Sequence, residues 1–152
     1  MNKRGQFYLV AAIIIVTIIV GFVSITNYVK KGETVLIKEV SEELSIETQK
    51  VQEYEVVAGE DKMNDYALTY SEHIGDSIEL YLITGISPNI NANKYLNGEV
   101  TSLNENLEVD KTTEKIIFTL YGEEYEFNLV EGENFYYIVY QEIKGESFVS
   151  LG

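Results

Sequence analysis

Residues 7–29 form a continuous stretch of 23 residues without a charged side chain, and no other feature constrains the fold as strongly. At ~1.5 Å per residue a helix of this length measures about 34 Å, enough to cross a hydrocarbon core of ~30 Å. A cleaved secretory signal would have only ~7 to 15 apolar residues before a small-x-small cleavage site. The sequence therefore predicts a basic leader at residues 1–5 and a transmembrane helix at residues 6–29.

Charge is divided unequally between the two sides of this stretch. Residues 30–152 hold 9 basic and 25 acidic side chains, a formal charge of −16, which excludes nucleic acid as a partner. We expect the leader to stay in the cytoplasm and the acidic domain to lie outside the cell membrane, as a single-pass protein. Basic residues flank the stretch almost equally on both sides, so the inverse topology is the alternative.

The residues Lys3, Arg4, Gly5 and Gln6 directly precede the apolar stretch. This junction resembles the class III signal peptide of archaeal type IV prepilins, which a membrane peptidase cuts after the glycine. The resemblance implies cleavage between Gly5 and Gln6, with prepilin peptidase, membrane lipid and other filament subunits or copies of the chain as partners. Many pilins carry glutamate where Val10 stands, which favours a minor or pilin-like surface protein. A plain signal anchor that is never processed is the alternative.

Apolar or small side chains recur at helical spacing after the membrane segment. They are Ile37, Val40, Leu44, Val51, Tyr54 and Ala58. The pattern predicts a long amphipathic helix that continues the membrane segment, within a helical region at residues 30–75. A second, shorter helix is expected from Lys62 to Ser71. The apolar stripe packs either on the protein's own sheet or against other subunits, and both can hold together.

From residue 76 onward the period of the pattern changes to two, and short alternating segments are separated by turns such as Asn97-Gly98. Strands joined by tight turns run antiparallel, so residues 76–152 are predicted to form an antiparallel β-sheet region. The predicted fold class is α+β and pilin-like. It consists of an N-terminal transmembrane helix continuing as a long amphipathic helix, a short second helix and an antiparallel β-meander.

The chain carries few groups for catalysis. It has no cysteine, and its one imidazole, His73, has Ser71 and Glu72 near it only in sequence. The acidic residues match no calcium-binding loop. We therefore predict no catalytic residue, no cofactor and no metal site, and we do not expect an enzyme.

Five tyrosines in the C-terminal third offer an alternative, an aromatic surface for glycans or protein partners. They are Tyr121, Tyr125, Tyr136, Tyr137 and Tyr140. Together these patterns favour a membrane-anchored pilin-like surface protein with a structural or interaction role, processed by a prepilin peptidase after Gly5. The alternative is an unprocessed single-pass extracytoplasmic binding module.

Overall fold

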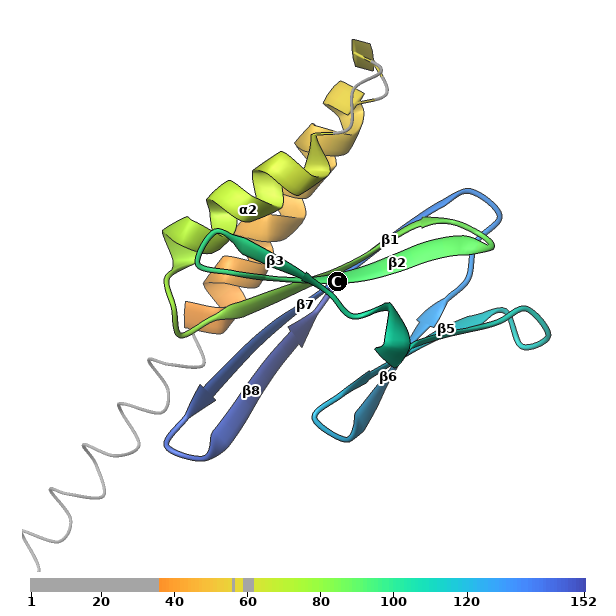
Figure 1. Ribbon diagram of the computed structural model, residues 1–152. Coiled ribbons are helices and arrows are strands. Elements are labelled where there is room, and N and C mark those ends of the chain that lie inside the picture. The colour runs from red at the N-terminus through yellow and green to blue at the C-terminus, as the bar shows by residue number, and fades with distance from the viewer. Residues whose placement is uncertain (1–35, 56, 59–61) are drawn as a thin grey trace, which may run out of the picture. The chain divides into compact units, whose positions relative to one another are not determined.

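The computed structural model describes residues 36–55, 57–58 and 62–152 (Figure 1). The predicted leader at residues 1–5 and the predicted transmembrane helix at residues 6–29 lie outside these ranges. Within them, no helix combines the length and the apolar character needed to cross a membrane.

Two helices pack on one face of the larger sheet. The long helix (residues 36–55, orange in Figure 1) buries Ile37, Val40 and Leu44 at spacings of three and four. Helix α2 (Met63–Ile74) buries Met63, Ala67, Tyr70 and Ser71. The predicted stripe is thus apolar and buried in its first half, whereas Tyr54 and Ala58 are exposed near the other end.

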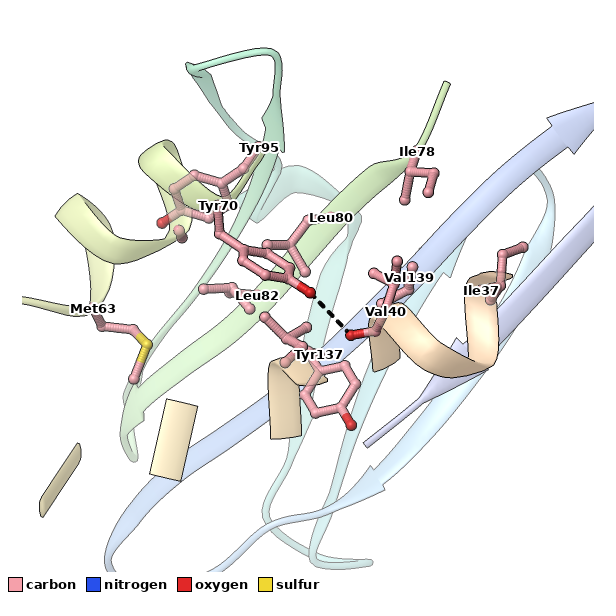
Figure 2. Close-up of a cluster of buried hydrophobic side chains, with 12 residues drawn as sticks. Ile37, Val40, Met63, Tyr70, Ile78, Leu80, Leu82, Tyr95, Tyr137 and Val139 are labelled. Carbon is pink, nitrogen blue, oxygen red and sulfur yellow. Dashed lines mark hydrogen bonds between the residues drawn. The ribbon is translucent and has the colours of Figure 1, made fainter. Parts of the chain in front are cut away.

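The larger sheet has five antiparallel strands in the order β3-β2-β1-β7-β8. Their bounds are β1 (Glu79–Ile86), β2 (Asn89–Leu96), β3 (Glu99–Ser102), β7 (Glu133–Ile143) and β8 (Glu146–Leu151). The expected turn at Asn97-Gly98 joins β2 to β3, and both residues have positive φ (50° and 74°), which confirms a hairpin there. Figure 2 shows the core between this sheet and the helices, where the Tyr70 hydroxyl donates to the Val40 carbonyl oxygen at 3.1 Å.

A second sheet covers part of the opposite face. It contains β4 (Leu107–Asp110), β5 (Lys115–Leu120) and β6 (Glu123–Asn128), and a 3-10 turn at Asn104–Asn106 leads into it. Ile116, Phe118 and Phe127 from this sheet pack against Tyr81 and Ile83 of β1 in a second core. The described domain therefore has three layers: helices, five-stranded sheet and three-stranded sheet.

The predicted fold class is wrong. The strands do not follow one another in a meander, because the chain leaves the first sheet after β3, builds the second sheet and returns to place β7 beside β1. The residues that the structure describes also contain no helix able to cross a membrane, and the residues predicted to form one lie outside them. The physical reason for the two sheets lies in β1, where Leu80 and Leu82 face the helices while Tyr81 and Ile83 face the other way. A strand that is apolar on both faces needs a covering layer on each side.

Candidate functional site

The predicted processing residues Lys3, Arg4, Gly5 and Gln6 lie outside the described residues. Cleavage after Gly5 therefore stays a prediction.

The residues around the single histidine do not form a catalytic group. His73 is exposed in the last turn of α2. The Ser71 hydroxyl is committed elsewhere, because it donates to the Leu68 carbonyl oxygen at 2.8 Å and accepts the Gly98 N–H at 2.9 Å. Ser71 therefore joins α2 to the β2–β3 turn, and a nucleophile activated by His73 is not assembled here. Within the described ranges, no group of three or more histidine, aspartate or glutamate side chains is placed to hold a metal ion.

The five C-terminal tyrosines do not share one surface. Tyr137 is buried on the helix side of the sheet, whereas Tyr140 is buried on the opposite side. The Tyr121 ring packs on Tyr140 with its centroid 4.8 Å away, and Tyr136 stacks on Phe127 at 4.7 Å. Most of these rings therefore hold the layers together, and only Tyr121, 63% exposed, has a largely free face.

A polar groove of about 620 Å³ lies on the helix side of the five-stranded sheet. Its rim comes from the end of the long helix and the start of α2, with Gln52 and Asn64 among the rim residues. Its floor is the part of β1 and β2 next to their shared hairpin, which extends beyond the helices in Figure 1. A volume of this size lies within the range of ~300–1,000 Å³ that is typical of small-molecule sites.

Strand register places the groove's polar side chains next to one another. Thr84 of β1 lies between Asn91 of β2 and Phe135 of β7 in the register of the sheet. Asn93 of β2 pairs with Ser102 of β3. Because residues two apart on a strand share a face, these side chains form one polar patch bordered by the Phe135 ring.

Part of this patch is already hydrogen-bonded and part is not. Asn104 accepts the Ala92 N–H at 2.8 Å and donates to the Asn91 side-chain oxygen at 3.2 Å, which fixes both amides. By contrast, Thr84, Asn93 and Ser102 have no side-chain hydrogen bond to any other described residue. The groove thus offers rigidly held amides beside polar groups that still have donors and acceptors to satisfy.

A second polar cluster links the two sheets on the opposite face. The Glu79 carboxylate accepts hydrogen bonds from Tyr81, from Lys94 and, at 2.8 Å, from Tyr121 in the β5–β6 turn. Burial would raise the pKa of Glu79, but these donors outweigh burial and hold that pKa below its ordinary value. Burial and the neighbouring carboxylate raise the pKa of the Tyr81 hydroxyl far above its usual range. All of these groups pair with one another, so we interpret the cluster as a structural link between the two sheets.

The groove is a site that sequence reasoning did not identify, although one signal for it exists. Asn89, Asn91 and Asn93 alternate along β2, and asparagine is depleted in strands. Because the three asparagines alternate along the strand, they lie on one face, and their presence indicates that this face has a role other than packing.

Comparisons with known proteins identify no relative. No family model, no curated protein and no solved structure matches the chain.

Proposed function

We propose that this chain is a membrane-anchored, pilin-like surface protein with a structural or interaction role, whose leader a prepilin peptidase removes after Gly5. The observation that carries the proposal is the junction of Lys3, Arg4 and Gly5 with 23 uncharged residues. The anchor would lie in residues 7–29, with the N-terminus in the cytoplasm and the acidic domain outside.

The exposed side of the long helix supports an interaction role. Leu36, Ile46, Tyr54 and Val57 are 45%, 57%, 55% and 87% exposed. At 100° per residue, Leu36, Ile46 and Tyr54 lie on one side of the helix. An apolar stripe in water is a common feature of surfaces that pack against other subunits. The partners would be copies of this chain or other filament subunits.

Intact-mass analysis of the full chain tests the proposed processing. The protein is expressed with and without a type IV prepilin peptidase, as wild type and as Gly5→Val, beside a known prepilin as the positive control. We expect a peptidase-dependent loss of residues 1–5 from wild type and none from Gly5→Val. If wild-type mass never changes while the control prepilin is cut, the chain does not enter the pilin pathway.

Membrane fractionation tests the anchor separately. The wild-type chain is expected in the membrane pellet after an alkaline carbonate wash, and external protease added to whole cells should degrade the acidic domain. Release of the chain by carbonate would contradict the anchor, and protection from external protease would favour the inverse topology.

The polar groove favours a second candidate function, an unprocessed membrane-anchored binding module. The observation behind it is that the side chains of Thr84, Asn93 and Ser102 line the groove and make no hydrogen bond to another described residue. Under this alternative, the intact mass stays that of the full chain even when the peptidase is present, and the domain binds a ligand in the groove.

A further inference from the structure

We propose that the groove between the helix ends and the β1–β2 hairpin binds an uncharged, hydroxyl-rich ligand, that is, a saccharide. The inference rests on the second candidate function, the binding module, and deepens it by naming the ligand class. It concerns the groove of the described domain, and its binding test can be carried out whether or not the leader is removed.

The chemistry of the lining selects the type of group that binds. Amide side chains at Asn64, Asn91 and Asn93 dominate the groove, with hydroxyls at Thr84 and Ser102. Each amide offers donors and an acceptor close together, and a sugar hydroxyl both donates and accepts. A lipid or an apolar small molecule would leave these polar groups unpaired on binding, which is costly.

The charge of the lining excludes anionic ligands. The described residues that line the groove include two glutamates, Glu55 and Glu133, and none of them is a lysine, arginine or histidine. Glu55 is already used by the fold, since it accepts the backbone N–H groups of Lys62 and Met63 at 2.6 Å each. A phosphate, a carboxylate or a nucleic acid would therefore meet negative potential without a cation to offset it.

The arrangement is preorganised for a ring-shaped ligand. Neighbouring strands are ~4.8 Å apart, so the polar side chains of β1, β2 and β3 span about 10 Å across the sheet. Phe135 is only partly buried and adds an apolar surface at the side, against which the C–H face of a sugar ring can pack. The hydrogen bonds of Asn104 hold part of this patch in place before any ligand arrives.

Fold requirements do not explain the residue choice on β2. Threonine or charged residues normally occupy the exposed face of a strand, and asparagine has a lower strand propensity than threonine. Asn93 is only partly exposed and still has no hydrogen-bond partner among the described residues. Such local disagreement between propensity and structure is expected at a binding site.

A titration of the full chain in detergent, followed by nuclear magnetic resonance, tests the proposal. The probes are maltotriose, cellotriose, mannotriose and chitotriose, with trigalacturonate as the anionic probe and capped trialanine as the peptide probe. The variant is Asn93→Leu, which removes donor and acceptor at similar size. The matched control is Asn128→Leu, an exposed asparagine of β6 outside the groove.

We expect at least one uncharged trisaccharide to shift the groove resonances of wild type and of Asn128→Leu with equal affinity. Asn93→Leu should weaken that binding by roughly tenfold or more. If Asn93→Leu does not fold, Ser102→Ala on the exposed edge strand replaces it and should also weaken binding.

Three results would overturn the proposal: no shift with any uncharged trisaccharide, equal or tighter binding of trigalacturonate or the peptide, or full affinity in the groove variant. The mass of the N-terminus is measured on the same samples, so failure of the groove and failure of leader processing are separate outcomes.

Discussion

Asn134 fixes the point at which the chain returns from the second sheet to the first. Its side chain is 1% exposed and accepts the Val130 N–H at 2.9 Å. Its amide nitrogen donates to the carbonyl oxygens of Gly85, Val130 and Gly132 at 3.1–3.2 Å. The side chain thus links the connection between β6 and β7 to the central strand β1.

Replacing Asn134 with aspartate keeps the shape and the acceptors but removes both N–H donors. Three carbonyl oxygens then lose their partner and face a carboxylate instead. Each buried unsatisfied polar group costs about 1–3 kcal/mol, and an unpaired buried charge about 3–5 kcal/mol. We therefore expect Asn134→Asp to lower the free energy of unfolding by about 3–5 kcal/mol, a large share of the ~5–15 kcal/mol of a typical domain.

Urea unfolding of the full chain in mild detergent, followed by circular dichroism at pH 7, measures this loss. Asn128→Asp is the matched control, because it adds the same charge at an exposed strand position and should change stability by less than about 0.5 kcal/mol. Burial raises the pKa of an aspartate above its unfolded value, so the loss should shrink as pH falls and the new carboxyl regains a proton to donate. A loss within about 1 kcal/mol of the control at pH 7 would refute the reasoning.

Three further changes test the layers of the domain by the same unfolding assay. The fold lowers the pKa of Glu79, so the stability that this carboxylate contributes is fully present above the unfolded pKa of about 4.5 and is lost at lower pH. Glu79→Gln should therefore have a lower free energy of unfolding than wild type at pH 7 and the same free energy of unfolding in acid. An equal loss of stability at pH 3 and pH 7 would contradict this. Leu44→Ala, at a fully buried position, should lower the free energy of unfolding by about 2–5 kcal/mol, whereas Ile46→Ala, at a position that is 57% exposed, should change it by less than about 0.5 kcal/mol. Similar losses in the two variants would show that Leu44 does not belong to the core. Gly85 has φ +131°, and an added Cβ would lie 2.2 Å from the Asn89 carbonyl oxygen. Gly85→Ala should therefore lower the free energy of unfolding by at least about 1–3 kcal/mol. If the variant is as stable as wild type, the β1–β2 hairpin accommodates the added methyl group without strain.

The sequence predicted the local elements of the described domain but not the way they combine. Helical spacing located the long helix and α2, and Asn97-Gly98 marked the β2–β3 turn correctly. Turn chemistry specifies which strands form hairpins, but it does not specify where each hairpin joins a sheet. The return of β7 to β1 depends on contacts between distant residues, such as the bond from Asn134 to Gly85, which no local pattern contains.

One local signal for the second layer was present in β1. Residues 80–83 are Leu, Tyr, Leu and Ile, and all four are buried. An alternating pattern predicts one covered face, whereas a continuous apolar run indicates a strand covered on both faces. Interpreting the run as part of an alternating pattern led to the prediction of a single antiparallel meander. Alternation does hold on β6, where Glu124, Glu126 and Asn128 lie on one exposed face.

The asparagines of β2 lead to a last prediction that separates fold from function. If Asn93 is present for binding and not for packing, a residue with higher strand propensity should improve the fold and damage the site. Asn93→Thr is expected to raise the free energy of unfolding by up to about 1 kcal/mol while it weakens saccharide binding. Asn128→Thr, at the exposed end of β6, is the control and should leave binding unchanged. If Asn93→Thr instead destabilises the domain, the amide of Asn93 stabilises the sheet, and its presence on β2 does not indicate a binding role.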